Sequence, residues 1–217
     1  MANPAIRAVL WDFGGVVTES PFTAFTAFER ARRLPEGFLR AVNSRNPDGN
    51  AWARFERGEL TPGAFDDAFA EEARALGHEI RGLDVFDLVF GPVRPMMLNA
   101  IRLCKRHFLT ACLTNNMRPA SGRGLELRPR LERDWRDALS VFDRVIESSR
   151  IGARKPESRF FELACAELEV EPPHAVFLDD LGINLKPARA MGMYTIKVTA
   201  PAEALQELRN LLQIELQ

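Results

Sequence analysis

The chain has 217 residues, enough to bury a sizeable hydrophobic core in one domain or in one domain with an insertion. Hydrophobic residues make up 46% and charged residues 27%, a balance that disordered chains do not have. The net charge of -1 gives no attraction to nucleic acid or to an anionic membrane surface, so we expect neither as a partner. No apolar run is long enough to span a membrane, and residues 1–7 lack the pattern of a signal peptide.

Cysteine and histidine are few and irregularly spaced. This spacing excludes the usual zinc motifs and a disulfide framework. We expect the three cysteines to be reduced thiols in the core of a cytoplasmic protein. The residues concerned are Cys104, Cys112, Cys165, His78, His107 and His174.

Strand signals are short apolar runs bounded by turn residues. The first of them leads into Asp12 and then breaks at a Gly-Gly turn, as expected for a fully buried strand of a parallel sheet. Later runs predict further strands, and apolar spacings of three and four predict helices. The predicted strands after the first cover residues 108–113, 142–147, 175–178 and 194–198. The predicted helices cover residues 22–32, 35–43, 51–57, 62–76, 94–106, 157–168, 185–191 and 201–212.

The order of these elements predicts an α/β protein with a parallel sheet covered on both faces. Helix starts are indicated by Ser20-Pro21, as an N-cap followed by proline, and by Thr61-Pro62. From the first strand to about residue 90 there is no strand signal, which is unusual in such a fold. This stretch therefore predicts an inserted helical module.

Four polar features stand at strand ends or in loops between elements. They are Asp12, Thr114-Asn115, Lys155-Pro156 and Asp179-Asp180. Three of the four directly follow an apolar strand, so these three are expected to meet at one edge of the sheet. Taken alone, each feature is common in turns and on surfaces. Their order and their strand-end placement together favour a site.

This combination suits phosphoryl chemistry. A carboxylate pair, Asp12 with one of Asp179 and Asp180, is the oxygen environment that Mg²⁺ prefers. A carboxylate beside the metal can attack phosphorus and form an aspartyl-phosphate. The Thr114 hydroxyl and backbone N–H groups at a strand-to-helix turn can donate to phosphate oxygens, and Lys155 supplies a compact positive charge.

The same motifs resemble the four signature motifs of the haloacid dehalogenase superfamily of phosphohydrolases. They are Asp12-x-Gly-Gly-Val, Leu113-Thr114-Asn115, Lys155-Pro156 and Phe177-Leu178-Asp179-Asp180. The segments 152–156 and 176–189 are most similar to the N-terminal phosphatase domain of soluble epoxide hydrolase and its bacterial single-domain relatives. The resemblance implies a Rossmann-like, three-layer core of residues 1–17 and 91–217, with a helical cap of residues 18–90.

By this resemblance, Asp12 is the nucleophile and a Mg²⁺ ligand, and Asp180 is a further ligand. Asp179 is either a ligand or a partner just behind the ligands. Gly14 binds the metal through its backbone carbonyl. The substrate implied is a small phosphate ester; the oligomeric state is left open.

The resemblance also assigns the phosphate contacts. Thr114 and Asn115 bind the phosphoryl group, and Lys155 neutralises its charge. Asn184 falls where the family has a polar residue that orients the lysine or the metal ligands. Its alternative role is that of an N-cap for the helix that follows.

Gly14 departs from the family pattern. Most phosphatases of the superfamily carry a second aspartate at this position, which acts as general acid and base. The sequence predicts a retained metal site without this proton shuttle, and general acid–base assistance is worth about 10²–10⁴-fold in rate. Thr18 and Glu19 are the nearest substitutes, although they also fit a plain loop into the cap.

Three functions therefore stay open. The favoured one is a Mg²⁺-dependent phosphatase, the second is a metal-free 2-haloacid dehalogenase that uses the same aspartate, and the third is a non-catalytic protein that binds a phosphorylated ligand or a protein partner. The Asp179-Asp180 pair argues against the second.

Two further groups of residues have a surface interpretation and a substrate interpretation. The arginine-rich segment 118–136 is expected to be solvated, with a rim that attracts anions as the alternative. For Arg54, Glu56 and Arg57 we expect exposed cap surface, with substrate contact as the alternative. The phenylalanine-rich cap helices are expected to form a cap core, and a pocket for an apolar substrate tail is the alternative.

Overall fold

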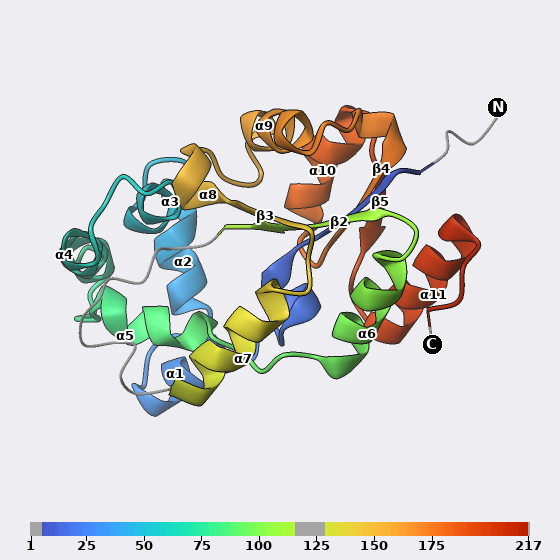
Figure 1. Ribbon diagram of the computed structural model, residues 1–217. Coiled ribbons are helices and arrows are strands. Elements are labelled where there is room, and N and C mark those ends of the chain that lie inside the picture. Colours follow the sequence, from blue (N-terminus) through green and yellow to red (C-terminus); the bar gives the residue numbers. More distant parts are fainter. Residues whose placement is uncertain (1–5, 116–128, 217) are drawn as a thin grey trace.

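A five-stranded parallel sheet forms the centre of the computed structural model, which describes residues 6–115 and 129–216 (Figure 1). The strand order is β3-β2-β1-β4-β5, and every neighbouring pair is parallel. The predicted α/β class and the parallel sheet are confirmed. The strands are β1 (Ala8–Trp11), β2 (Leu109–Thr114), β3 (Arg144–Glu147), β4 (Ala175–Asp179) and β5 (Tyr194–Lys197).

Helices cover both faces of the sheet, which gives the core three layers (Figure 1). One face carries α6 (Pro95–Cys104), α7 (Pro129–Leu139) and α11 (Pro201–Leu212). The other face carries α9 (Ser158–Leu168) and α10 (Gly182–Ala190), with the short α8 (Ser148–Ile151) at the end of β3. Because side chains alternate along a strand, β1 contributes to the hydrophobic clusters on both faces.

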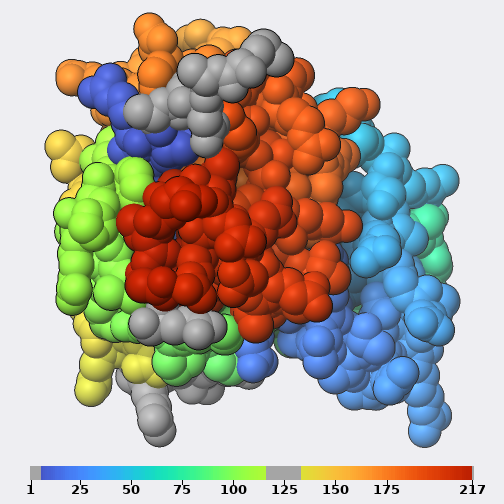
Figure 2. Space-filling model, turned by 90° about the vertical axis from the view of Figure 1, so that its right-hand side faces the viewer, coloured from blue at the N-terminus to red at the C-terminus, as the bar shows by residue number. Residues whose placement is uncertain are grey.

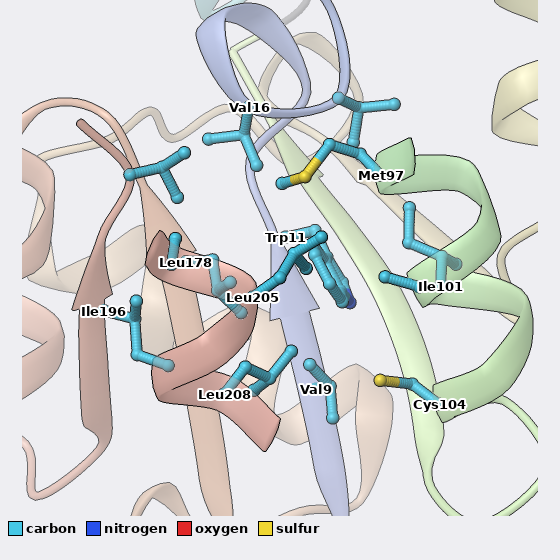
Figure 3. Packing of buried hydrophobic residues seen from close by; sticks show 14 of the residues in the cluster. Val9, Trp11, Val16, Met97, Ile101, Cys104, Leu178, Ile196, Leu205 and Leu208 are labelled. Atoms are coloured by element: carbon cyan, nitrogen blue, oxygen red, sulfur yellow. The ribbon is translucent and has the colours of Figure 1, made fainter. Parts of the chain in front are cut away.

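Strand β1 is the central strand of the sheet, with β2 on one side and β4 on the other. Trp11, its last residue, is fully buried and packs among Met97 and Ile101 of α6 and Leu205 and Leu208 of α11 (Figure 3). Figure 2 shows α11 (red) spread over this side of the core. Asp12 comes directly after Trp11, so the dense packing fixes the point where the strand delivers this carboxylate.

A second group of helices, which we call the helical block, lies to one side of the core, opposite α11 (Figure 1). It has a hydrophobic cluster of its own, in which the rings of Phe55 and Phe65 stack with their centroids 4.4 Å apart. Its helices are α1 (Phe22–Ala31), α2 (Phe38–Ser44), α3 (Ala51–Glu56), α4 (Pro62–Arg74), α5 (Gly82–Phe86) and the 3-10 turn η2 (Asp87–Val89). The predicted helical insertion is therefore present.

The two connections between the block and the core run side by side. Thr18 forms an isolated antiparallel bridge with Val93, and the Arg94 N–H donates to the Val17 carbonyl at 2.8 Å. Paired crossings of this kind hold the two ends of the insertion together. The assignment of residues 18–90 to a separate cap domain stays a prediction.

Some local predictions are wrong. Helix α1 has Pro21 at its N-cap position with no side-chain cap, so Ser20 does not cap it. The predicted break after Asp12 is confirmed, because the chain forms a tight turn over Phe13–Val17. The Thr61 cap is confirmed, because its hydroxyl accepts from the Ala64 N–H at 3.3 Å.

Helices α5, α7 and α8 do not follow from the sequence patterns. Two of them are too short to show a period, and α7 is rich in charged residues. All three cysteines are free and buried, as expected. Within the described ranges no helix has the length and apolarity needed to cross a membrane.

Candidate active site

Three carboxylates meet at the carboxyl end of the sheet. The parallel register pairs Trp11 with Leu178, and the Asp12 N–H donates to the Leu178 carbonyl at 2.8 Å. Asp12 therefore lies beside Asp179, the last residue of β4. One oxygen from each of Asp12, Asp179 and Asp180 lies within 4.8 Å of the others. These residues meet at one edge of the sheet, as predicted.

Lys155 reaches this cluster from the loop between α8 and α9. Its Nζ donates to Asp12 Oδ1 at 2.6 Å and to Asp179 Oδ2 at 2.9 Å, and its side chain is only 1% exposed. Burial acts to lower the lysine pKa, but the charges of Asp12 and Asp179 outweigh it and raise the pKa above its usual value. Lys155 is therefore a buried ammonium group that bridges two carboxylates.

Three carboxylates, those of Asp12, Asp179 and Asp180, lie around the one ammonium group of Lys155. Burial, together with the charges of Asp179 and Asp180, raises the pKa of Asp12 to about 8 against the opposing effect of Lys155. Burial and the charge of Asp179 raise the pKa of Asp180 to about 6. Both shifts have the same causes, namely burial and the presence of three carboxylates around one lysine. A divalent cation bound by these oxygens would relieve the excess negative charge, and an all-oxygen donor set is the one Mg²⁺ prefers.

Asp179 and Asp180 have different surroundings. Asp179 is fully buried, and its carboxylate accepts from the Leu181 N–H at 2.8 Å and from Asn184 Nδ2 at 3.1 Å as well as from Lys155. Asp180 is partly exposed. Asp179 thus has its acceptor positions occupied by the protein, whereas Asp180 faces the site. Asn184 lies inside α10, so the N-cap interpretation is wrong and its side chain orients Asp179.

The turn after Asp12 is shaped by a close approach. Gly15 has a φ of +85°, and a Cβ on it would lie 2.3 Å from Asp180 Oδ2. Arg94 Nη1 donates to the Gly15 carbonyl at 2.6 Å and to the Val16 carbonyl at 3.2 Å, which ties the turn down. Gly14, in contrast, has an ordinary φ of -73°, and a Cβ on it would have no neighbour within 4 Å. Nothing in the sequence pattern indicates the role of Arg94.

Asn115 holds the loop that carries the lysine. Its Oδ1 accepts from the Lys155 N–H at 2.8 Å, and its Nδ2 donates to the Lys155 carbonyl at 2.9 Å and to Glu56 Oε2 at 3.2 Å. The expected exposure of Glu56 is wrong, because this residue is only 7% exposed. Arg54 is exposed as expected, and Arg57 is mostly buried in an ion pair with Glu157.

A cleft of about 470 Å³ opens between these residues and the helical block. Asp12, Gly14, Thr114, Asn115 and Lys155 contribute to its polar end. The rest of its wall is largely apolar and comes from both the helical block and the core. The apolar side chains are Phe13, Pro21, Phe22, Phe25, Trp52, Phe86, Val89, Phe90, Trp135, Pro156, Leu181 and Ile183.

Several candidates from the sequence do not contribute to this cleft. Thr18 is buried, Glu19 is exposed, and neither lines it. Arg133 and Arg136 are exposed and do not line it either. Most of the arginine-rich segment 118–136 lies outside the described residues.

A family model for haloacid dehalogenase-like hydrolases matches residues 6–192. The chain belongs to this family. The resemblance predicted from the motifs is confirmed, and the protein is a hydrolase of the haloacid dehalogenase superfamily.

Sequence relatives include acyl-CoA dehydrogenase family member 10 of Mus musculus, 36% identical over 95% of this chain, and bifunctional epoxide hydrolase 2 of Sus scrofa, 32% identical over 98%. The chain spans only 19% and 40% of the lengths of these two relatives. The sesquiterpene phosphatase astK of Aspergillus oryzae is 25% identical over 95% of this chain and 96% of its own length.

Solved structures confirm the fold. An enzyme of the family from Bacteroides thetaiotaomicron, in complex with magnesium and inorganic phosphate, has a TM-score of 0.58 at 19% identity, over 89% of this chain and 94% of that one. An L-2-haloacid dehalogenase from Xanthobacter autotrophicus has a TM-score of 0.60 at 20% identity, over 98% of this chain and 84% of that one. The fold is thus shared by an enzyme solved with magnesium and phosphate and by a dehalogenase, so the fold alone does not decide the reaction.

The two adjacent glycines give a matched test of the site geometry. We expect Gly15→Ala to lower the free energy of unfolding by more than about 1–2 kcal/mol, because alanine resists the positive φ and its Cβ meets Asp180. Gly14→Ala has open space and a normal φ, so we expect a change within about 1 kcal/mol. Urea unfolding of both variants measures this difference. Equal stabilities would contradict the close approach of Gly15 to Asp180.

Proposed function

We propose that the protein is a Mg²⁺-dependent phosphatase that hydrolyses a small phosphate ester through an aspartyl-phosphate on Asp12. The observation that carries this proposal is that the carboxylates of Asp12, Asp179 and Asp180 meet around one ammonium group, that of Lys155. Such a cluster is costly without a further cation. The carboxylates of Asp12 and Asp180 and the carbonyl of Gly14 would hold the metal. When bound, Mg²⁺ offsets the repulsion between the anionic nucleophile and the anionic phosphate.

Asp12 is suited to nucleophilic attack. Its Oδ1 accepts from Lys155 Nζ and from the Phe13 N–H at 2.6 Å each, whereas no donor among the described residues is directed at Oδ2. Oδ2 would form the bond to phosphorus while the bond from phosphorus to the ester oxygen breaks. Water then attacks the phosphorus and releases inorganic phosphate and the Asp12 carboxylate. Lys155 neutralises negative charge on the phosphoryl group in both steps. The Thr114 hydroxyl donates to a phosphoryl oxygen.

The apolar wall of the cleft suits a substrate whose organic group is apolar. Beyond the polar end, its wall includes Phe22, Phe25 and Phe90, and Ile183 is 64% exposed at this surface. An apolar group placed there would bury surface worth about 25 cal/mol per Å². The similarity to a sesquiterpene phosphatase agrees with such a group.

The cleft holds no obvious replacement for the missing acid. Besides Asp12, the carboxyl groups of the described residues that line it are Asp48, which is exposed, and Glu56, which is held by hydrogen bonds. The leaving oxygen would then take its proton from water. We therefore propose a slow enzyme that prefers good leaving groups.

Removal of the metal separates the phosphatase from a 2-haloacid dehalogenase. We expect EDTA to abolish hydrolysis of p-nitrophenyl phosphate and added Mg²⁺ to restore it, since two carboxylates besides Asp12 repel the anionic substrate without a cation. A 2-haloacid serves as the control substrate. Release of halide in the presence of EDTA would establish the dehalogenase instead.

Asp12→Asn tests the nucleophile. The amide cannot attack phosphorus, so we expect loss of p-nitrophenyl phosphate hydrolysis to background with an unchanged circular dichroism spectrum. Binding of phosphate and Mg²⁺ without turnover by the unmutated protein would instead support the non-catalytic alternative. Near-normal turnover by the variant would mean that Asp12 is not the nucleophile.

Gly14→Asp tests the missing proton shuttle. A Cβ at this position would meet nothing within 4 Å, and Gly14 lines the cleft, so an aspartate there can extend its side chain from open space at its base. We expect an increase in turnover of about 10²-fold for alkyl phosphates and a smaller one for aryl phosphates, whose leaving groups need less protonation. Gly14→Ala is the control, because it adds a Cβ without an acid, and it should not show this increase. An equal or lower rate for the aspartate variant would show that protonation is not limiting.

A further inference from the structure

Glu56 is a buried carboxylate of the helical block that contacts the phosphate-binding end of the core. It is the last residue of α3 and lines the cleft. Its Oε2 accepts from Asn115 Nδ2 at 3.2 Å and from Arg154 Nε, and its Oε1 accepts from Trp52 Nε1 at 3.1 Å. The side chain thus joins the helical block to the end of β2 and to the loop that carries Lys155.

The backbone of Glu56 makes a second link to the core. Its carbonyl accepts from Ser148 Oγ at 2.6 Å, at the start of α8, and α3 and α8 lie side by side (Figure 1). Arg154 also donates to the Pro47 carbonyl at 3.3 Å. Because Glu56 is held at both its backbone and its carboxylate, its position relative to Asn115 is well defined.

The carboxylate of Glu56 and the Lys155 peptide require the same orientation of the Asn115 amide. A carboxylate only accepts, so it requires the nitrogen of the amide and not the oxygen. With Nδ2 directed at Glu56 and the Lys155 carbonyl, Oδ1 is left for the Lys155 N–H. The amide therefore holds the Lys155 peptide at two points, and Lys155 in turn bridges Asp12 and Asp179.

We infer that Glu56 is a positioning residue, which fixes Asn115 and through it places Lys155 for the phosphoryl group. This inference deepens the proposed phosphatase function and rests on it. Glu56 does not act as the missing acid, because both of its oxygens accept hydrogen bonds and one is paired with Arg154.

A double-mutant cycle tests whether Glu56 acts through Asn115. The proteins are the unmutated chain, Glu56→Gln, Asn115→Ala and the combination, measured with p-nitrophenyl phosphate and Mg²⁺. We expect Glu56→Gln to lower kcat/KM about tenfold or more, since a misplacement of 1 Å can cost about 10². In the Asn115→Ala background the same change should cost less than about twofold, because residues that act as a unit are not additive.

Glu59→Gln is the matched control. Glu59 lies three residues further along, is 46% exposed and pairs with Arg57 at the surface. This variant should keep kcat/KM within about twofold of the unmutated protein, as is usual for surface positions. If Glu56→Gln does not fold, Trp52→Phe removes the donor to Oε1 while it keeps an aromatic ring in the cleft wall. The part of its loss of kcat/KM that acts through Glu56 should be absent in the Asn115→Ala background.

A spectroscopic measurement tests the role of Glu56 independently of catalytic activity. The side-chain amide signal of Asn115, assigned by its disappearance in Asn115→Ala, should shift in Glu56→Gln and stay in place in Glu59→Gln. Full additivity in the cycle, or an unmoved Asn115 signal in Glu56→Gln, would overturn the positioning role. Absence of hydrolysis by the unmutated protein would instead refute the phosphatase function, and the amide signal would still decide the role of Glu56.

Discussion

The buried ammonium of Lys155 is the interaction on which the rest of the site depends. Burying it and two carboxylates removes three charges from water, which costs several kcal/mol per ion unless the geometry is good. Removing one partner of such a group typically costs about 3–5 kcal/mol, because the others are left uncompensated. The protein therefore has to place Asp12, Asp179 and Lys155 accurately, and each comes from a different part of the chain. Rigid packing around β1 and β4 supplies two of them, while Asn115 and Glu56 hold the loop that supplies the third.

The sequence predicts the polar groups of this site better than it predicts their partners. Asp12 and Asp179 could be placed at one edge because each follows an apolar strand, and strand order brings parallel carboxyl ends together. The positions of Arg94 and Glu56 could not be predicted, since polar residues on helices and at their ends usually face water. Their burial depends on which helix packs against which strand end. That information lies in contacts between residues tens of positions apart, which no local period records.

For the fold, too, features that follow a local pattern could be predicted and features that depend on distant contacts could not. The long apolar periods of the helical block and the buried strands are visible along the chain, so their existence could be predicted. The break at the glycine pair after Asp12 could be predicted in the same way, but the shape of the turn over Phe13–Val17 could not. That shape follows a constraint that is not local, namely the approach of Gly15 to the Asp180 carboxylate. The positive φ of Gly15 therefore becomes apparent only in the folded chain.

The two glycines of this turn differ in whether the backbone requires them. Gly15 is required by the backbone, since its φ is positive and a Cβ would meet Asp180. Gly14 has no such requirement, because its φ is ordinary and the space beside it is open towards the cleft. The backbone therefore does not require a glycine at position 14. Under the proposed phosphatase function, a site that keeps its carboxylate cluster and has a glycine in place of the usual acid would suit substrates whose leaving group needs little protonation. We therefore propose that the leaving group of the substrate contributes to selectivity as well as the cleft.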